Sequence, residues 1–252
     1  MNGDDALLKK RLKELSDRSR SRGSYEATGF LDLASQSVLH ALENSGEVSP
    51  AALYGGTENA ERVIAVFGNE ETNGYEYFPG ICCIRISPRS EKYGEELSHR
   101  DVLGALMSLG IKRELIGDLF TDGKTAYAVA LASIAEYIEK NLTSVRHTDV
   151  DCERIDALPQ GVGPHIREQC YISASERLDC IIAAVYNISR SAAKELFEKE
   201  RVYVRGRLRA NAGTDAKVND VVSVRGLGKF VFYGPVGETK KGRLKISVGL
   251  YE

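Results

Sequence analysis

Residues 173–206 read SASERLDCIIAAVYNISRSAAKELFEKERVYVRG, and they predict two short helices followed by a strand. Ser175 can cap a first helix, from Glu176 to about Tyr186, which keeps its large apolar side chains on one face. Ser189 can cap a second helix, from Arg190 to about Lys199. The β-branched run VYV then begins the strand.

Farther along, residues 221–234 read VVSVRGLGKFVFYG and predict further strands around a Gly-rich bend. Two short helices against a small sheet make an α+β domain over residues 173–252. This segment carries 15 Lys and Arg against 9 Asp and Glu, whereas residues 1–172 have a balance of −8. Because nucleic acids respond to local charge, the C-terminal domain is the expected partner of structured RNA.

Three groups of polar side chains in this domain are candidate RNA contacts. Arg190, Ser191 and Lys194 lie outside the apolar stripe of the second helix, at its N-terminus, where the helix dipole favours phosphate. The period-two spacing of a strand would put a second group on one face, namely Arg205, Arg207 and Arg209. The third group flanks glycines that let a backbone approach closely: Arg225 and Lys229. For any single residue, a solvated surface charge is the simpler interpretation, but the set favours RNA contact.

The segment from residue 70 to 156 alternates strand-like and helix-like stretches in the order βαββαβ. The predicted elements are strand 81–87, helix 99–110, strand 116–121, strand 125–132, helix 133–142 and strand 144–151. This is the ferredoxin-like order, which RNA-recognition (RRM-like) domains also use, although no fully developed aromatic RNP strand is visible. The order predicts a compact middle domain without proving that it binds RNA.

The chain before residue 70 predicts a helical or mixed N-terminal domain. Leu7, Leu8, Leu12 and Leu15 form one apolar stripe, residues 30–42 form another, and AERVIAVFG at 60–68 fits a buried strand. We therefore expect a multidomain α+β protein. Its predicted parts are an N-terminal domain at 1–69, a middle domain at 70–156, a linker at 157–172 and the RNA-binding domain at 173–252.

The five cysteines contain no CxxC pair, so we expect buried free thiols, no metal site and no cofactor. No apolar run approaches the roughly 20 residues that span a bilayer, and the N-terminus lacks the apolar core of a signal peptide. A cytoplasmic protein without a membrane span is the expectation. The oligomeric state stays open, with a monomer as the default.

The stretch SERLDCIIAAVYNISRSAAKELF, followed by VYVRGR and NDVVSVRGLGKF, resembles the S4-type (alpha-L) RNA-binding domain. The resemblance covers about a quarter of the chain. It implies that the family's RNA contacts fall on Arg177, Ser189, Arg190, Ser191, Lys194 and Arg225. Two residues depart from the pattern: Glu200 stands where Gly is usual, and Arg205 where Asn is usual.

Upstream, GGTENAERVIAVF and LSHRDVLGALMSLGIKRELIGDLF, at 97–120, resemble the bacterial YlmH family, which has this domain at its C-terminus. The resemblance then covers nearly the whole chain. It implies a three-part architecture and a role with the large ribosomal subunit: recognition of subunits obstructed by peptidyl-tRNA, in ribosome-associated quality control. The implied partners are large-subunit ribosomal RNA, transfer RNA, or both.

The polar residues of the central motif are a possible second RNA contact: His99, Arg100, Lys112 and Arg113. Alternatively, they belong to a helix N-terminus with ion pairs to Asp101 or Glu114. A third interpretation, His99 as a general base beside Asp101, lacks an accompanying nucleophile or cofactor site.

Two other functions stay open. The S4-type domain is often joined to RNA-modifying enzymes, and Arg177-Leu178-Asp179 resembles the RLD of pseudouridine synthases. No TxG follows this triplet, however, and residues 1–172 contain no GxGxG-like loop for S-adenosylmethionine, so we expect a protein that is not an enzyme. The second is a cell-division protein whose acidic N-terminal part recruits a protein partner.

Overall fold

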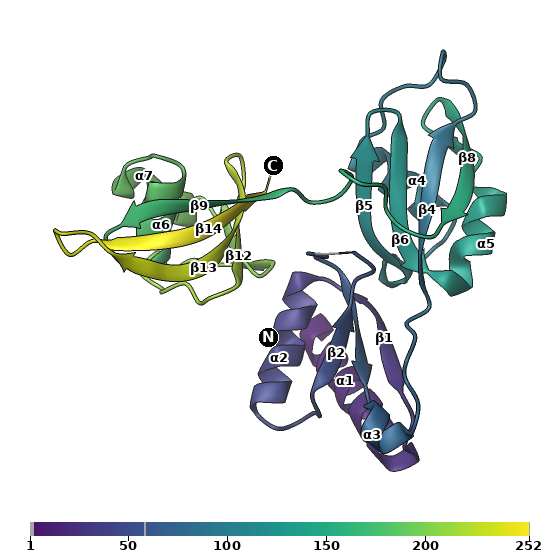
Figure 1. The fold of residues 1–252 in the computed structure, drawn as a ribbon, viewed down its shortest axis with the longest axis horizontal. Helices are drawn as coiled ribbons and strands as arrows, with labels where there is room; N and C mark the ends of the chain where they lie inside the picture. The colour runs from purple at the N-terminus through teal and green to yellow at the C-terminus, as the bar shows by residue number, and fades with distance from the viewer. Residues whose placement is uncertain (1–2, 58, 252) are drawn as a thin grey trace. The chain divides into compact units, whose positions relative to one another are not determined.

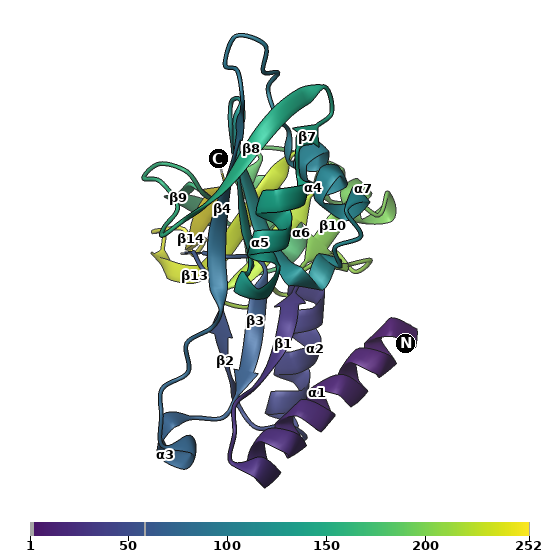
Figure 2. The same cartoon turned by 90° about the vertical axis from the view of Figure 1, so that its right-hand side faces the viewer.

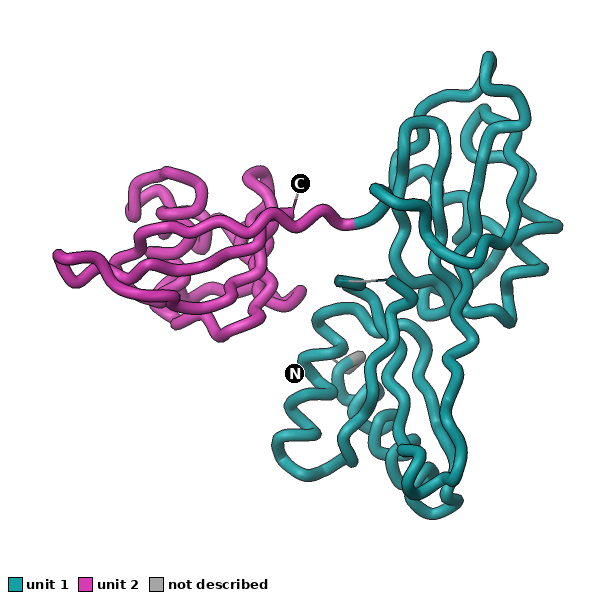
Figure 3. Tube along the Cα trace, in the orientation of Figure 1, with its two compact units in different colours: residues 1–163 teal, residues 164–252 magenta. Residues whose placement is uncertain are grey.

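The computed structural model describes residues 3–57 and 59–251 and divides the chain into two compact units, residues 1–163 and 164–252 (Figure 1, Figure 3). The secondary structure is mixed α+β. Across these described ranges the strands form three sheets, and their pairings are antiparallel. Each unit has its own buried apolar side chains.

The first unit begins with two helices on a small sheet. Its elements are α1 (Gly3–Arg22), β1 (Glu26–Leu31), α2 (Leu33–Asn44), β2 (Ala51–Tyr54) and β3 (Val63–Phe67), with strand order β1-β3-β2. Leu12 and Leu15 of α1 pack with Leu39 of α2 and Phe67 of β3, so both helices share one face of the sheet (Figure 2). Leu7 is wrongly predicted as part of this stripe, because its side chain is 70% exposed.

The second predicted stripe starts too early. Phe30 lies in β1, and α2 begins only after Asp32, whose carboxylate accepts a hydrogen bond from Ser35 N at 2.8 Å. This N-cap separates the strand from the helix. Val38, Leu39 and Leu42 then form the buried face of α2, as the periodicity predicts.

The middle of the chain has the predicted βαββαβ order. Its elements are α3 (Glu70–Asn73), β4 (Ile81–Pro88), α4 (His99–Ser108), the short 3-10 helix η1 (Arg113–Leu115), β5 (Ile116–Asp122), β6 (Thr125–Leu131), α5 (Ala132–Asn141), β7 (Ser144–Val145) and β8 (Thr148–Ile155). The strand order is β5-β6-β4-β8-β7. A turn at Arg146, with φ of 55°, divides the predicted last strand into β7 and β8.

Side chains from β4, β5 and β6 pack with α4 and α5 on one face of this sheet. The opposite face meets the N-terminal sheet: Phe30, Ile64 and Val66 form one cluster with Val129 of β6. Gly117 allows the close approach, because a Cβ atom there would lie 2.8 Å from Cε1 of Phe30. The two sheets of the first unit are therefore joined by an apolar contact.

Polar contacts reinforce this junction. Asp118 accepts a hydrogen bond from Glu61 N at 2.7 Å, and Arg62 donates to the carbonyl oxygens of Ile116 at 3.1 Å and Phe30 at 2.9 Å. Burial raises the pKa of Asp118 and lowers that of Arg62. Backbone groups on each side of the junction thus hydrogen-bond a charged side chain from the other side.

The second unit contains two helices and a six-stranded sheet. Its elements are β9 (Ile166–Ser173), α6 (Leu178–Val185), α7 (Arg190–Glu198), β10 (Val202–Val204), β11 (Arg207–Leu208), β12 (Asp220–Val224), β13 (Gly228–Glu238) and β14 (Leu244–Tyr251), with strand order β11-β10-β12-β13-β14-β9. Both helices pack on one face, through Ile181, Leu196, Phe197 and alternate strand residues such as Phe230 and Phe232.

Two predictions for this unit are corrected. Residues 166–172, predicted as linker, form most of β9 and pair along β14, so this part of the chain belongs to the sheet. The first helix begins at Leu178, with Arg177 at the N-cap position and no side-chain cap, instead of beginning after Ser175. The Ser173 hydroxyl donates to the Ser175 carbonyl at 2.7 Å, which turns the chain between β9 and α6.

Candidate nucleic-acid interface

The N-terminus of α7 has the predicted cap. The Ser189 hydroxyl accepts a hydrogen bond from Ala192 N at 3.1 Å and lies 2.9 Å from the Ser191 hydroxyl. Ser189, Ser191 and Lys194 are exposed, while Ala193, Leu196 and Phe197 face the core. The helix end therefore presents hydroxyl groups, a partial positive charge and a lysine to solvent.

Two predicted contact residues, Arg177 and Arg190, are fixed by a buried carboxylate. The Asp179 side chain is 0% exposed and lies 2.9 Å from Arg190 Nε and 3.1 Å from Arg177 Nε. Burial alone would raise the pKa of Asp179, but hydrogen bonds from Arg190 and Arg177 hold that pKa below its usual range. The side chains of Arg190 and Arg177 are 50% and 38% exposed, so Asp179 orients two arginines that still reach solvent.

The predicted row of Arg205, Arg207 and Arg209 does not form along one strand face. Arg205 lies in a turn with φ of 49°, and its Nε is 2.6 Å from an Asp220 oxygen. Arg207 pairs with Val204, whose side chain is in the core, so Arg207 lies on the helix side of the sheet edge. Arg209 follows β11 and is exposed.

Glu200 and Arg205 both adopt the left-handed backbone region, with φ of 54° and 49°. Gly and Asn are the residues that enter this region most readily. Glu200 and Arg205 therefore adopt the left-handed conformation that Gly and Asn adopt more easily, so both turns have the backbone shape of the S4-type pattern without its usual residues. For Arg205 the Asp220 ion pair offsets part of the strain.

Arg225 and Lys229 lie on the other face of the sheet from α7. The Arg225 guanidinium is 4.5 Å above the ring of Tyr203, and Lys229 Nζ is 5.1 Å above the ring of Tyr251. Gly226 and Gly228, between Arg225 and Lys229, have φ of 86° and 137°, which only glycine adopts without strain. The predicted contact residues thus divide between two faces of the domain, a division that spacing alone did not reveal.

The four polar residues of the central motif are not brought to one place. His99 and Arg100 begin α4, whose N-terminus has a capping box formed by Ser98 and Asp101, whereas Lys112 follows the far end of that helix. Arg113 is half-buried, donates to the Ile116 and Gly117 carbonyl oxygens, and has its pKa lowered by burial to about 10. Arg113 therefore contributes to the junction in the first unit, and its predicted RNA contact stays a prediction. Arg100 and Lys112 are exposed.

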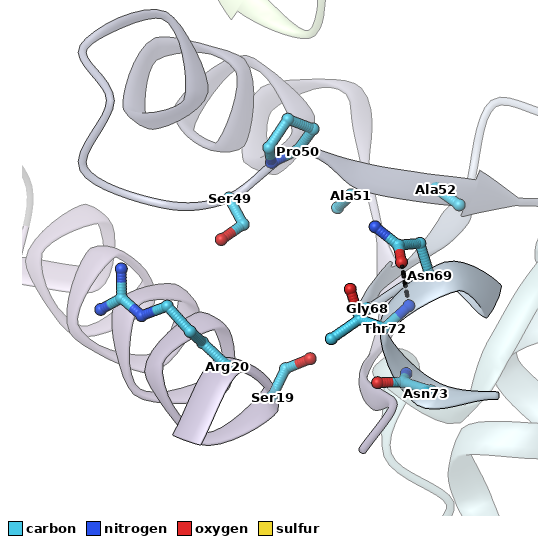
Figure 4. A pocket seen from close by; sticks show the side chains of 10 residues that line it. All are labelled: Ser19, Arg20, Ser49, Pro50, Ala51, Ala52, Gly68, Asn69, Thr72 and Asn73. Atoms are coloured by element: carbon cyan, nitrogen blue, oxygen red, sulfur yellow. Dashed lines mark hydrogen bonds between the residues drawn. The ribbon is translucent and has the colours of Figure 1, made fainter. Parts of the chain in front are cut away.

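Two hollows of the first unit lie on different elements. One, of about 430 Å³, is lined by Ser19, Arg20, Ser49, Asn69 and Asn73 among others (Figure 4). The other, of about 490 Å³, lies on the part of the middle sheet that includes Arg85, Ser87 and Tyr127. Arg85 forms an ion pair with Glu153 at 2.6 Å. Neither hollow brings together the predicted RNA-contact residues.

The cysteines are free, but the predicted burial holds fully only for Cys83 and Cys180, because Cys82 and Cys152 are partly buried and Cys170 is exposed. Burial raises the pKa of Cys83 to about 11 and that of Cys152 to about 12, whereas Cys170 on β9 is exposed. Within residues 3–57 and 59–251, no cluster of three His, Cys, Asp or Glu side chains has an arrangement that could hold a metal ion. Over the same ranges, no helix has the length and apolar character needed to cross a membrane.

Known proteins resemble this chain both within one segment and over nearly its whole length. Residues 84–158 match the family described as "Putative RNA-binding domain in YlmH". The chain is 27% identical over 251 residues to the ribosome-associated protein quality control protein P2 of Bacillus subtilis (strain 168), covering 97% of this chain and 92% of the relative. The solved structure of the cell division protein ylmH from Streptococcus pneumoniae covers 62% of this chain and 93% of that chain, with a TM-score of 0.48 and 18% identity. Residues 84–158 are therefore similar to the putative RNA-binding domain of YlmH, and nearly the whole chain is similar to the relative from Bacillus subtilis.

Proposed function

We propose that this protein is a non-catalytic RNA-binding factor that associates with the large ribosomal subunit carrying peptidyl-tRNA and assists ribosome-associated quality control. The observation that carries the proposal is the N-terminus of α7, where exposed Ser191 and Lys194 stand beside an arginine that buried Asp179 holds in place. Such an edge suits the phosphates of a folded RNA. The relative from Bacillus subtilis, whose name refers to ribosome-associated quality control, supports the biological setting.

The architecture that we propose has three parts: an N-terminal domain at 1–69, an RRM-like ferredoxin fold at 70–156 and a C-terminal S4-type domain. The element order and the strand order β5-β6-β4-β8 support the ferredoxin-like assignment. Two helices against a sheet, with left-handed turns at Glu200 and Arg205, support the S4-type assignment.

The middle domain contributes to RNA binding less directly in this proposal. RNA-recognition domains bind RNA on the sheet face that has no helices, and here that face packs in part against Phe30, Ile64 and Val66 of the N-terminal sheet. The exposed remainder includes the Arg85–Glu153 ion pair, which leaves little uncompensated positive charge. The C-terminal domain therefore supplies the main contact, in the cytoplasm, with ribosomal RNA, transfer RNA or both.

The test is sedimentation of the purified protein with separated small and large ribosomal subunits, and with large subunits that carry or lack peptidyl-tRNA. We expect sedimentation with the large subunit, stronger in the presence of peptidyl-tRNA, and a steep loss of binding as salt rises, because each phosphate contact releases counterions. Equal binding to both subunits, or binding that salt barely weakens, would contradict the proposal. Uridine isomerisation or methyl transfer by the pure protein would instead assign it to the RNA-modifying enzymes.

A further inference from the structure

The helix-free face of the C-terminal sheet carries tyrosines and cations. Val202 and Val204 point into the core, so Tyr203 between them points away from α6 and α7. Phe230 and Phe232 likewise point inward, which turns Lys229 and Tyr233 outward. Together with Tyr251 and Arg225, these residues define the tyrosine face: Tyr203, Arg225, Lys229, Tyr233 and Tyr251.

Strand register brings these side chains close together. Tyr203 of β10 and Lys229 of β13 both pair with Ser223 of the intervening strand β12. Lys229 in turn reaches Tyr251 of β14. One row across four strands therefore contains Tyr203, Ser223, Lys229 and Tyr251, with Arg225 above its first ring.

The Tyr233 side chain lies close to Gly249 of β14. A Cβ atom at Gly249 would lie 2.6 Å from the Tyr233 hydroxyl oxygen and 2.9 Å from its Cε2, so the ring occupies the space that a side chain would fill. Gly249 is buried, while Tyr233 is 37% exposed. The absence of a side chain at Gly249 thus leaves room for the Tyr233 ring, and part of Tyr233 stays accessible to solvent.

The charge of this face suits an anionic ligand. Arg225 and Lys229 are cationic, and the pairing of Glu168 with Gly249 places one carboxylate at the far edge. That carboxylate accepts a hydrogen bond from the Ser247 hydroxyl. Cations alternate with aromatic rings on this face. The cations can contact the phosphates of single-stranded RNA, and the rings can stack on its bases.

We propose that the tyrosine face binds unpaired RNA nucleotides, whose bases stack on the Tyr203–Arg225 pair and on Tyr233 and Tyr251. The guanidinium plane over Tyr203 offers a stacking surface of its own, and Lys229 lies where it can meet a phosphate. This inference rests on the proposed RNA-binding function and adds a second surface on the sheet face opposite α7. The α7 edge contacts folded RNA, and the tyrosine face contacts a single-stranded segment.

The experiment compares two fluorescent probes, a short single-stranded oligouridine and a fully paired RNA hairpin, in binding titrations with the full chain. The test variant is Tyr203→Leu with Tyr251→Leu, which keeps apolar surface and removes the aromatic rings. The control is Tyr93→Leu with Tyr137→Leu, because both tyrosines are exposed in the first unit and Lys92 Nζ lies 5.3 Å from the Tyr93 ring. Denaturant unfolding of all variants checks that the domains fold.

We expect the test variant to bind oligouridine roughly fivefold or more weakly, the lower end of the effect of losing one base–aromatic stack, with hairpin binding unchanged. The control variant should match the wild type with both probes. If the folded test variant binds oligouridine as the wild type does, and the wild type binds the hairpin, the tyrosine face does not bind RNA. The proposed function would still hold. Absence of binding to either probe and to ribosomal subunits would overturn both.

Discussion

Arg190 Nε lies 2.9 Å from a carboxylate oxygen of Asp179, and this ion pair joins a fully buried side chain to one that is 50% exposed. The two residues are 11 positions apart in the chain, on α6 and α7. The pair therefore links the start of the proposed RNA-binding helix to the core of its domain. It also explains why the arginine of an exposed helix end keeps a defined position.

Replacement of Asp179 by Asn should lower the free energy of unfolding by about 1.5–3 kcal/mol at neutral pH, the usual value of hydrogen bonds to a charged group. The folded-state pKa of Asp179 is lowered, so its contribution is complete above the unfolded pKa of about 4 and is lost as pH falls through the folded value. The difference in free energy of unfolding between wild type and Asp179→Asn, measured with urea, should become smaller below about pH 4. Asp215→Asn, at an exposed position, is the control. A difference that stays constant in acid would contradict this account of the ion pair.

Glu200→Gly should stabilise the C-terminal unit by roughly 0.5–1 kcal/mol, because relief of the left-handed strain exceeds the entropic cost of glycine. The same replacement at Glu195, inside α7, should destabilise by about 1 kcal/mol. Chemical unfolding of the two variants and the wild type measures both effects. A loss of stability in Glu200→Gly would show that this turn is not strained.

Gly117→Ala should weaken the junction between the two sheets of the first unit, since the new Cβ would lie 2.8 Å from Phe30 Cε1. We expect a loss of about 1–3 kcal/mol, as for other overpacked contacts, together with faster limited proteolysis within residues 1–163. A Cβ atom at Gly104 of α4 would meet open space, so Gly104→Ala should instead stabilise by up to about 1 kcal/mol. Equal stability of Gly117→Ala and wild type would show that Phe30 can move aside without cost.

The cysteines should separate into fast and slow classes toward a thiol reagent at pH 8. Cys170 is exposed, whereas burial raises the pKa values of Cys83 and Cys152 to about 11 and 12 and keeps their thiols protonated. Cys170→Ser should remove the fast phase, and Cys83→Ser should leave it intact. A fast phase that survives in Cys170→Ser would mean that another thiol becomes accessible through local opening.

The sequence allowed prediction of most elements whose signals are local. Ser189 and the apolar spacing of α7 predicted its start, because an N-cap involves residues only three apart, and helix 99–110 was predicted with the start that α4 has. β9 was missed because its residues include Arg167, Glu168 and Gln169, and their place in a sheet depends on pairing with β14, about 80 residues later.

The site was less predictable than the fold, because charge alone does not reveal a partner. Arg113 resembled a surface cation but donates to two backbone carbonyl groups, and Arg205 is held by Asp220. The Arg113 contacts lie three and four residues ahead but depend on the turn into β5, and the Arg205 contact joins residues 15 positions apart. The alternation in VYV and KFVFY was visible and could have indicated outward Tyr203 and Tyr233, but the row with Tyr251 requires the strand order.

The N-terminus of α7 is the proposed RNA contact, and acidic substitutions there can test it without loss of folding. Arg190→Glu would set a second carboxylate beside buried Asp179 and destabilise the domain. Ser191→Asp with Lys194→Glu avoids this problem, because acidic residues in the first turns of a helix favour its dipole while they repel phosphate. Ser21→Asp with Lys10→Glu makes the same charge change on α1, in the other unit.

The most direct measurement is therefore cosedimentation of wild type, the α7 variant and the α1 control with large ribosomal subunits that carry peptidyl-tRNA. We expect wild type and control to sediment alike. The α7 variant should unfold at a denaturant concentration at least as high as the wild type and should bind more weakly by an order of magnitude or more. Equal sedimentation of all three proteins would contradict the assignment of the α7 edge as the RNA contact.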